Sequence, residues 1–345
     1  MKKVLVRRAG SFRQLEIVEG EIPPCAENEA LVRTASIGVN FADCVVRMGL
    51  YPSATKYVGW PITPGFELSG VIEQVGAGPN PRNLRVGDQV FGVVQFGAYS
   101  THVPVPLSQL YRIPEGLSLT QAGVISVSAF TAWYALGVLG AASPGMKVLV
   151  HSAAGGVGST MVQMAKLLGC QVVGVVGASH KVAALEELGV DVVIDKSQQD
   201  LFRAAQSAVP KGFDLILDAN GAETMRASYR ALRPTGRLIL YGAHSMLTRG
   251  SGNKNWARIV YQFLRTPRFD PLSMINDNRS VMAFNLSYLF EEQKLLDSAF
   301  ERIGRWYARG ELRTPSITEY ALSDVGRAHK ELQSGTTVGK LTLIP

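Results

Sequence analysis

Short apolar runs alternate with turn residues over residues 1–120. Runs with β character stand at 30–34, 70–75 and 88–94, and the segments between them are rich in Gly, Pro, Asn and Asp. Several short strands separated by tight turns predict a β-rich domain that forms a partly closed barrel.

From residue 147 the pattern changes to alternating strands and helices. Repeated βα units with continuously apolar strands predict an α/β fold with a doubly wound parallel sheet. The predicted strands are 148–150, 172–176, 190–194, 215–217 and 238–241, and the predicted helices are 156–168, 181–188, 200–208 and 224–232.

The last hundred residues are less regular. An irregular basic stretch is expected up to Arg279, then a strand at 281–286 and an amphipathic helix at 291–309. Residues 339–345 again have the pattern of a strand and are expected to return to the first domain. The predicted division is therefore 1–125 with 310–345 for the β-rich domain and 126–309 for the parallel-sheet domain.

One segment, 121–146, has no charged residue and is long enough to span a bilayer. It also contains several hydroxyl residues and the breaker Ser143-Pro144-Gly145, so a buried helix is predicted and no membrane span. The first residues are charged but have no apolar stretch of signal-peptide length. A cytoplasmic protein is expected.

The charge and the cysteine content exclude some classes of protein and of metal site. The chain has 35 Lys and Arg against 28 Asp and Glu, a net charge of +7. This excess favours anionic ligands, but no basic run resembles a nucleic-acid-binding tail, so no nucleic acid is expected as a partner. The 3 cysteines are too few for a disulfide scaffold or a four-cysteine zinc site.

A dinucleotide-binding motif follows the predicted strand that ends at His151. Its form is A-x-G-x-x-G, with Ala153 in the first glycine position. Gly155 allows a pyrophosphate to approach the backbone, Gly158 allows the helix to pack closely on the strand, and the helix N-terminus supplies free N–H groups. The predicted pyrophosphate contacts are Ala154, Gly155, Gly156, Val157 and Gly158.

The next strand indicates which dinucleotide binds. An NAD site normally has Asp or Glu about 20 residues beyond the glycines, whereas strand 172–176 leads into Gly177-Ala178-Ser179-His180-Lys181 with no carboxylate before Glu186. A hydroxyl donor at Ser179 and a cation at Lys181 suit a 2′-phosphate. NADPH is therefore predicted, with Gly177, Ser179 and Lys181 at its adenosine end; a solvated lysine at a helix start is the alternative.

Taken together, several motifs resemble those of one family. They are G-V-N-F-A-D at 38–43, G-L-Y-P at 49–52, P-G-F-E at 64–67, V-G-D at 86–88, the motif at 153–158, and Gly339-Lys340. The chain resembles, over essentially its whole length, the zinc-independent quinone oxidoreductase (zeta-crystallin-like) group of the medium-chain dehydrogenase/reductases. Residues 243–288 resemble its vesicle amine transport protein-like branch. The resemblance implies a GroES-like domain beside a Rossmann domain, and a homodimer.

The same resemblance bears on metal binding. Zinc-dependent relatives have Cys at the position of Asn40, His at that of Phe66, and a further Cys within the segment that here is 124–130. Phenylalanine cannot ligate zinc and an amide is a poor substitute for a thiolate, so no metal is expected.

Without zinc, hydride transfer from NADPH to a quinone or an α,β-unsaturated ketone or aldehyde is the expected chemistry. Tyr51 is the candidate hydroxyl donor to the substrate, although it could equally be a packing ring, and Val45 stands where many quinone oxidoreductases have a second tyrosine. The other residues expected at the cofactor are Asn40 (also a candidate catalytic residue), Thr131, Asn220, Gly242, Phe284, Leu286 and Lys340.

A second function stays open at this stage. The basic insertion at 244–279 combines arginines with aromatic residues. A non-enzymatic NADPH-binding protein could use it to contact a membrane, RNA or another protein.

Overall fold

The computed structural model of the chain describes residues 1–246 and 255–345, which form two compact units. Unit 1 contains residues 1–130 and 286–345, and unit 2 contains 131–246 and 255–285. Residues 286–309, which the sequence pattern assigned to the parallel-sheet domain, fall in unit 1. The predicted class, a β-rich domain together with a doubly wound parallel sheet, is confirmed.

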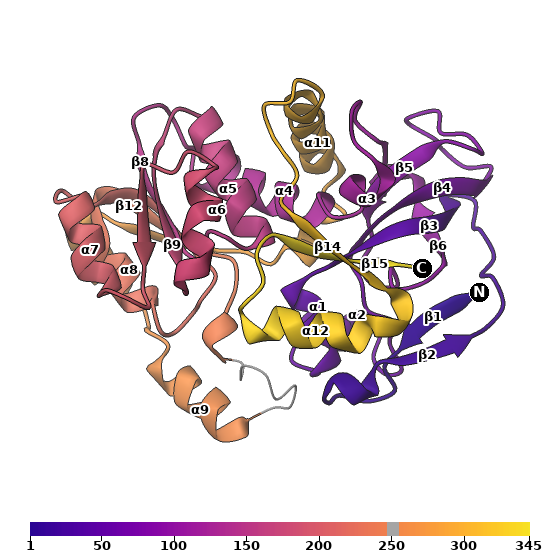
Figure 1. Cartoon of the computed structure of the whole chain (residues 1–345), viewed down its shortest axis with the longest axis horizontal. Helices are drawn as coiled ribbons and strands as arrows, with labels where there is room; N and C mark the ends of the chain where they lie inside the picture. Colours follow the sequence, from indigo (N-terminus) through magenta and orange to yellow (C-terminus); the bar gives the residue numbers. More distant parts are fainter. Residues whose placement is uncertain (247–254) are drawn as a thin grey trace. The chain divides into compact units, whose positions relative to one another are not determined.

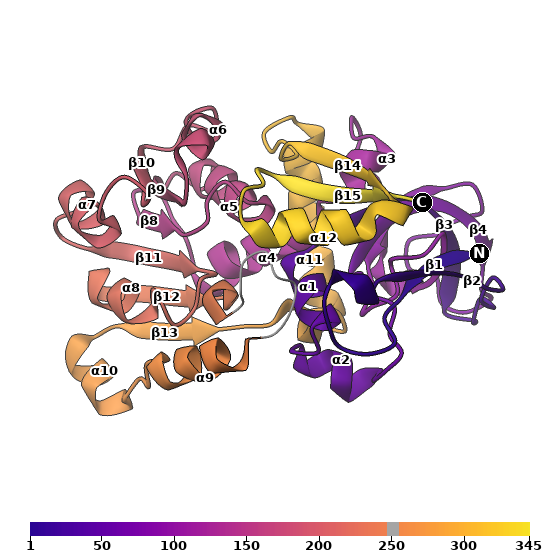
Figure 2. The ribbon, with the colours of Figure 1, turned by 60° about the horizontal axis from the view of Figure 1, so that its bottom comes forward.

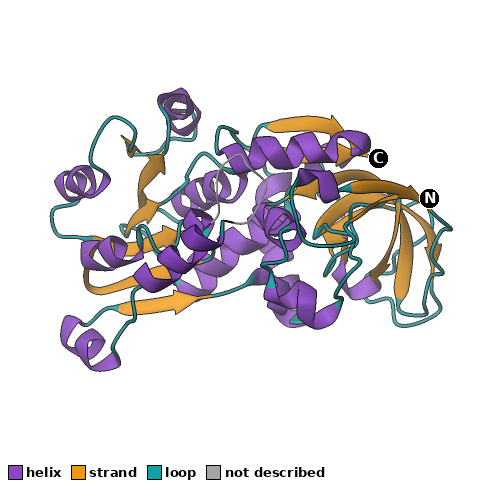
Figure 3. Ribbon diagram, turned by 90° about the horizontal axis from the view of Figure 1, so that it is seen from below, coloured by secondary structure: helices purple, strands orange, loops and turns teal. Residues whose placement is uncertain are grey.

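Unit 1 is built on a seven-stranded sheet around the long strand β3, which is labelled in Figure 1. Figure 3 shows strands of this unit in orange near the two marked termini. Strands β4, β6 and β15 all pair antiparallel with β3. The sheet order is β14-β15-β3-β4-β5-β7, and a separate pair is formed by β1 and β2. The bounds are β1 Lys2–Leu5, β2 Glu16–Glu19, β3 Glu29–Val39, β4 Glu67–Val75, β5 Gln89–Val93, β6 His102–Pro106, β7 Leu110–Arg112, β14 Ile317–Ala321 and β15 Lys340–Ile344.

The apolar side chains of these strands form the core of unit 1. Ile37, Leu68, Val90 and Leu343 are completely buried in one cluster. Leu343 on β15 lies opposite Ile37 on β3, so the C-terminal strand of the chain completes the sheet that carries the N-terminal motifs. The polar residues that follow β3 and begin β4 and β15 are thereby held at neighbouring positions.

The helices of unit 1 begin where the sequence provides caps. Asn40 is the N-cap of α1 and forms a capping box with Asp43, and Pro52 opens α2. The helices are α1 Phe41–Arg47, α2 Pro52–Tyr57, α3 Leu119–Ala122, α4 Ser126–Trp133 (which runs on into unit 2), α11 Gln293–Ala308 and α12 Val325–Ser334, with short turns η1 Phe12–Gln14, η2 Leu107–Gln109, η6 Leu286–Leu289 and η7 Leu322–Asp324.

Unit 2 is a six-stranded parallel sheet of order β10-β9-β8-β11-β12-β13. The order reverses at β8, which is the topological switch point where such sheets bind ligands. Helices α5 and α6 lie on one side of the sheet and α7 and α8 on the other (Figure 1). The strands are β8 Lys147–Val150, β9 Gln171–Val176, β10 Val192–Asp195, β11 Phe213–Asp218, β12 Leu232–Leu240 and β13 Ser280–Ala283.

The helices of unit 2 agree with the predicted ones within a few residues, except after residue 243. There the irregular stretch expected from the sequence contains two helices, α9 and α10 (Figure 2). Asn255 and Asp270 cap them by accepting from the N–H groups of Arg258 and Ser273. The bounds are η3 Tyr134–Leu139, α5 Gly156–Leu167, η4 Ser179–Lys181, α6 Val182–Glu186, α7 Leu201–Ala208, α8 Met225–Ala231, η5 His244–Met246, α9 Trp256–Arg265 and α10 Pro271–Asp277.

The uncharged segment 121–146 forms short helical pieces: the end of α3, then α4 and the π-helical turn η3. In the part of the chain that the structure describes, no helix has both the length and the apolar character needed to cross a membrane.

Candidate functional site

The glycine-rich turn between β8 and α5 has the geometry of a pyrophosphate cradle. Gly155 is the N-cap of α5, and the N–H groups of Gly156, Val157 and Gly158 form its first turn, where no intrahelical acceptor exists. A Cβ on Gly158 would overlap the carbonyl oxygen of Ser152, and it would lie 2.8 Å from the Cα of Ala153. Only glycine lets α5 start this close to the turn.

Polar groups surround the ends of the neighbouring strands β8 and β11. Ser152, in a left-handed conformation (φ 53°), donates a hydrogen bond to Asn220 Oδ1 over 3.1 Å. The buried Asp218 accepts from the Asn220 N–H at 2.7 Å and the Thr224 hydroxyl at 2.7 Å. Asn220 is therefore held at the carboxyl end of the sheet, where its role as a cofactor contact was predicted.

His151 and Gly242 complete this edge of unit 2. His151 Nε2 lies 3.0 Å from the Ser228 hydroxyl, and burial lowers the pKa of the histidine. A Cβ on Gly242 would lie 2.9 Å from the Ala219 carbonyl oxygen, so the chain after β12 passes directly over the end of β11. His151 belongs to the core of the unit.

Polar groups from the adjacent strand β10 also lie at the end of β9. The Ser179 hydroxyl donates to Asp195 Oδ2 at 2.6 Å, and Asp195 stands at the end of the adjacent strand β10. This bond and those from Ser197 hold the pKa of the Asp195 carboxyl below its ordinary value. Ser179 thus directs its proton to a carboxylate within the protein.

Two lysines flank this position. Lys181 is largely buried at the end of η4. A Cβ added to Gly177 would meet Lys196 Cε at 3.6 Å, so the Lys196 chain runs past the end of β9. Asp195 and Lys196 were not predicted from the sequence, because they stand at the end of β10 and only the pairing of β10 with β9 brings them near Ser179. Lys181 follows Ser179 by two residues and Lys196 follows Asp195 directly, so each of the two adjacent strands leads into a cationic residue.

In unit 1, three buried polar side chains form one hydrogen-bonded cluster, the Asn40–Glu67–Lys340 cluster. Lys340 Nζ donates to Glu67 Oε1 at 2.6 Å and to Asn40 Oδ1 at 2.7 Å. Asn40 Nδ2 donates to the same Glu67 oxygen at 2.8 Å, and Glu67 Oε2 accepts from the Val127 N–H at 2.8 Å. The amide of Asn40 is therefore fixed by both of its polar atoms.

The Asn40–Glu67–Lys340 cluster also explains why residue 38 is a glycine. A Cβ at that position would overlap the Glu67 carboxylate, so the G-V-N motif allows the carboxylate to reach Asn40. Glu67 is completely buried and Lys340 is 4% exposed. Lys340, expected to contact the cofactor, is the counter-ion of Glu67.

Asp43 ties two loops of unit 1 together. Its carboxylate accepts from the N–H of Asn40 at 2.7 Å and from that of Gly65 at 2.9 Å, and Tyr99 also hydrogen-bonds it. Burial raises the pKa of Asp43 to about 7, although these hydrogen bonds act in the opposite direction. Behind Tyr99 lies the buried His329, whose Nε2 is 3.1 Å from the Tyr99 hydroxyl and whose Nδ1 is 3.1 Å from Arg47 Nη1.

Tyr51 lies in a group of three aromatic rings, the Tyr51–Phe66–Phe96 cluster. Ring centroids are 5.5 Å apart for Tyr51 and Phe66, 5.1 Å for Phe66 and Phe96, and 6.4 Å for Tyr51 and Phe96. Phe66 is buried, and the other two rings are half-buried. The predicted donor therefore stands beside apolar rings, in surroundings that suit an uncharged ligand.

The remaining predicted contacts are placed as follows. Thr131 is a buried residue of α4 that belongs to unit 2. The Phe284 N–H donates to the Leu240 carbonyl at 3.1 Å, and its ring lies 4.9 Å from that of Tyr134. Leu286 begins η6 in unit 1. The roles of these residues, and of the other predicted site residues, stay predictions.

A zinc ion does not fit the residues at the two positions compared with zinc-dependent relatives. Asn40 Oδ1 faces the Lys340 ammonium, which would repel a cation, and the Phe66 ring has no donor atom. Within residues 1–246 and 255–345, no group of three or more His, Cys, Asp or Glu side chains is arranged to hold a metal ion.

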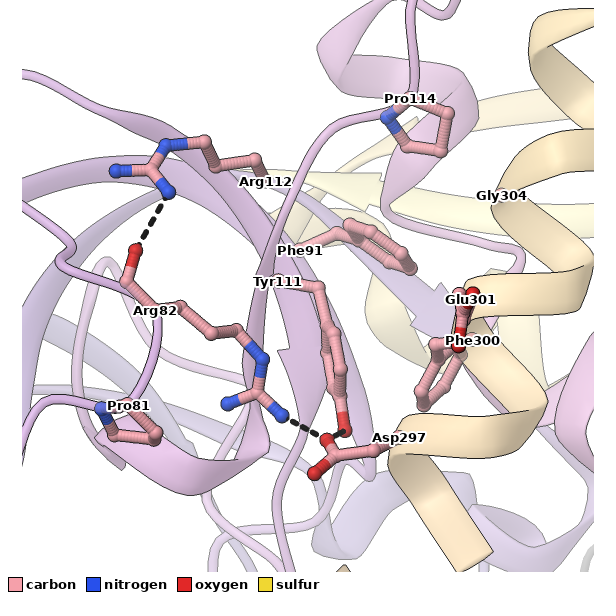
Figure 4. Close-up of a pocket in the computed structure, with 10 residues that line it drawn as sticks. All are labelled: Pro81, Arg82, Phe91, Tyr111, Arg112, Pro114, Asp297, Phe300, Glu301 and Gly304. Carbon is pink, nitrogen blue, oxygen red and sulfur yellow. Dashed lines mark hydrogen bonds and ion pairs between the residues drawn. The ribbon is translucent and has the colours of Figure 1, made fainter. Parts of the chain in front are cut away.

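An open pocket of about 490 Å³ lies elsewhere on unit 1, between α11 and the β5–β7 side of the sheet (Figure 4). Its arginines bind within the protein: Arg82 pairs with Asp297, and Arg112 donates to the Arg82 carbonyl oxygen at 2.7 Å and to Asp88 at 2.9 Å. Tyr111 also donates to Asp297. None of the predicted site residues lines this pocket.

Comparisons with known proteins agree with both units. Residues 26–115 match the alcohol dehydrogenase GroES-like domain, and residues 156–287 match the domain described as zinc-binding dehydrogenase. The synaptic vesicle membrane protein VAT-1 homolog of Homo sapiens is 31% identical over 94% of this chain and 80% of its own length. The Danio rerio homolog is 34% identical over 96% of this chain, which spans 66% of that protein.

Among solved structures, the Escherichia coli quinone oxidoreductase complexed with NADPH has a TM-score of 0.86 and 27% identity, with 100% of each chain covered. The cofactor of that enzyme is the dinucleotide predicted here from the residues after β9. The chain accordingly belongs to the medium-chain dehydrogenase/reductase family of oxidoreductases, in the quinone oxidoreductase group and its VAT-1 branch.

Proposed function

We propose that the protein is an NADPH-dependent, zinc-independent reductase that delivers hydride to a quinone or to an α,β-unsaturated ketone or aldehyde. The observation that carries the proposal is the chemistry of Asn40 and Phe66, which stand where zinc-dependent relatives have two of their metal ligands. Asn40 there is bonded to an ammonium group, and Phe66 offers a ring. With no Lewis acid to polarise an alcohol, an acceptor that is already electron-poor is the substrate that hydride chemistry requires.

The residues of unit 2 suit the proposed cofactor. The N–H groups of Gly156, Val157 and Gly158 would bind the pyrophosphate, and Lys181 and Lys196 would supply the positive charge for a 2′-phosphate. NADPH supplies the hydride when bound. The Escherichia coli quinone oxidoreductase, a solved structure of this fold complexed with NADPH, supports the same assignment.

On unit 1, Tyr51 is the proposed donor to the acceptor's oxygen. Hydride addition to the conjugated carbon leaves an enolate or hydroquinone oxygen, which takes a proton from the Tyr51 hydroxyl or from water. The Asn40–Glu67–Lys340 cluster fixes the loop that begins α1. Asn40 of unit 1 is a proposed contact of the nicotinamide end, and Thr131 is a proposed contact from unit 2. Backbone groups of Phe284 and Leu286 are proposed at the carboxamide.

A panel of quinones, cyclic enones and alkenals, assayed by the loss of NADPH absorbance, tests the function. We expect turnover with NADPH, little with NADH, and no loss of activity after treatment with a chelator. Lys181→Glu should weaken NADPH binding by roughly ten- to hundredfold, because a charge-assisted contact contributes about 1.5–3 kcal/mol, and should leave NADH nearly unchanged.

Lys211→Glu, at an exposed position of the same unit, is the matched control and should keep the NADPH affinity. Preference for NADH in the unmodified protein, or a tightly bound zinc whose removal abolishes turnover, would contradict the assignment. Absence of turnover over the whole panel would leave the second function below as the better account.

That second function, a contact role for the 244–279 insertion, is supported by α9. Its inward positions are polar: Arg258 donates to Glu223 and to the Ser245 carbonyl, and Gln262 donates to Glu223. Its outward positions Val260, Phe263 and Leu264 are 53–77% exposed. An apolar face turned outward favours a membrane or protein surface over RNA. A homodimer and a cytoplasmic location remain part of the proposal.

A further inference from the structure

Phe96 has a backbone conformation that few non-glycine residues adopt. Its φ is 140°, and the following Gly97 has φ 95°. On one side of it the Val94 N–H donates to the Phe66 carbonyl at 2.9 Å, and on the other the Gly97 N–H donates to Thr63 at 2.9 Å. The two bonds impose the bend. Holding a phenylalanine in this conformation strains the backbone, and a glycine would avoid that strain.

The ring contacts of Phe96 act against this strain. Its ring meets Phe66 at 5.1 Å in a tilted arrangement and Tyr51 at 6.4 Å edge to face. Each such pair of rings adds a modest attraction beyond the apolar area that it buries. Because the Phe96 ring is only half-buried, these two contacts and a part of its apolar area are what balance the strain.

The position of the ring suggests what it is for. Three separate segments deliver the three rings of the cluster: the start of α2, the loop before β4 and the loop after β5. Phe66 is buried beneath, while Tyr51 and Phe96 each keep part of their surface open. The Tyr51 hydroxyl is the only polar atom that the three side chains contribute, so their exposed surface suits a flat, uncharged group.

We propose that Phe96 is a specificity-determining residue of the reductase. The Phe96 ring, supported from beneath by the buried Phe66, stacks against the planar face of a cyclic conjugated acceptor, while the Tyr51 ring, at 88° to that of Phe96, borders the acceptor's edge. This arrangement favours ring-containing acceptors over open-chain alkenals. This inference rests on the proposed function. It differs from it by assigning the choice among acceptors to one strained residue.

The test compares Phe96→Gly and Phe96→Tyr with the unmodified protein. The ring acceptor is 9,10-phenanthrenequinone, which has no position for thiol addition, and the open-chain acceptor is trans-2-hexenal. For each, kcat/KM is measured at saturating NADPH, and equilibrium binding is measured by calorimetry in the presence of NADP⁺, where no hydride is available.

Phe96→Gly should lower kcat/KM and affinity for phenanthrenequinone about tenfold relative to hexenal, the size expected for one lost stacking contact. Phe96→Tyr keeps the ring and should restore the ratio. The melting temperature of Phe96→Gly should change little, since the relieved strain offsets the lost packing.

Two results would overturn the inference: a ratio of the two acceptors that Phe96→Gly leaves within about twofold, or a large loss of melting temperature with equal losses for both acceptors. Binding in the NADP⁺ complex separates this inference from the proposed function. If the unmodified protein turns over neither acceptor, a selective loss of phenanthrenequinone binding in Phe96→Gly still supports the role of the ring, and equal binding refutes it.

Discussion

The two units build their candidate sites from different materials. In unit 2 the cradle at the start of α5 consists of backbone N–H groups that a short glycine motif leaves accessible. In unit 1 the Asn40–Glu67–Lys340 cluster consists of side chains separated by 27 to 300 residues along the chain. The first kind of site depends on the absence of a Cβ, and the second depends on charge balance in a buried place. The two should therefore fail in different ways.

The largest effect is expected from unbalancing the buried charges of unit 1. Glu67→Gln leaves the Lys340 ammonium, 4% exposed, without its counter-ion. Breaking a buried pair in this way should lower the free energy of unfolding by about 3–5 kcal/mol, measured by urea denaturation. Glu73→Gln is the matched control, because the Arg33–Glu73 pair lies on the surface. It should cost less than about 1 kcal/mol, and equal losses in the two variants would mean that burial does not distinguish these pairs.

The same contrast explains what could be predicted from the sequence. Up to residue 231 the strands and helices of unit 2 were predicted within a few residues, because apolar periodicity and capping residues act over short distances. The glycine motif was predicted for the same reason, since Gly158 contacts the residues immediately before it. Ser179 and Lys181 could be proposed as cofactor contacts because they lie within five residues of the end of β9, and their contact with the cofactor stays a prediction. The early start of β12 and the helices α9 and α10 were not predicted.

What could not be predicted depends on pairing between distant segments. Asp195 reaches Ser179 only because β10 lies beside β9, and Lys340 reaches Glu67 only because β15 pairs with β3 next to β4. A lysine after a glycine gives no local sign that its partner lies 273 residues away. The strain at Phe96 likewise comes from hydrogen bonds to another loop.

In unit 2, adding the methyl group of alanine at Gly158 should disrupt the candidate site, as loss of the Glu67 charge should in unit 1. Gly158→Ala places a Cβ against the Ser152 carbonyl, and the turn or the helix must shift. Overpacking of this kind costs about 1–3 kcal/mol, and we expect NADPH affinity to fall by roughly ten- to hundredfold in fluorescence titrations.

Gly304→Ala is the matched control for this substitution. Gly304 lies inside α11, and apart from the backbone of its own helix no heavy atom of the described residues lies within 4 Å of the Cβ that alanine would add. Alanine should therefore stabilise unit 1 by up to about 1 kcal/mol through its helix propensity, with NADPH affinity unchanged. If both variants lost stability, steric overlap at Gly158 would not be the cause of its effect.

The smallest effect is expected on the pH dependence of the free energy of unfolding, and it comes from a buried histidine of unit 1. His329 in unit 1 is completely buried, and burial together with the nearby Arg47 lowers its pKa well below 6.5. The folded protein therefore keeps this histidine neutral, whereas the unfolded chain takes up a proton below about pH 6.5, so its contribution to stability is lost as the pH falls. The loss amounts to about 1.4 kcal/mol for each pH unit below that point. The Asp43 carboxyl, with a pKa raised to about 7, acts in the opposite direction between its ordinary pKa and pH 7.

Comparing variants isolates the histidine from Asp43, which is present in all of them. His329→Gln retains a hydrogen-bonding side chain but cannot be protonated, so its free energy of unfolding should fall less steeply between pH 6.5 and 5 than that of the unmodified protein. His180→Gln changes an exposed histidine of unit 2 and should reproduce the unmodified slope. If His329→Gln kept the full slope, the acid sensitivity would have to come from other groups, of which the buried His151 in unit 2 is the first to replace. In that case protonation of His329 would not be what destabilises unit 1 in acid.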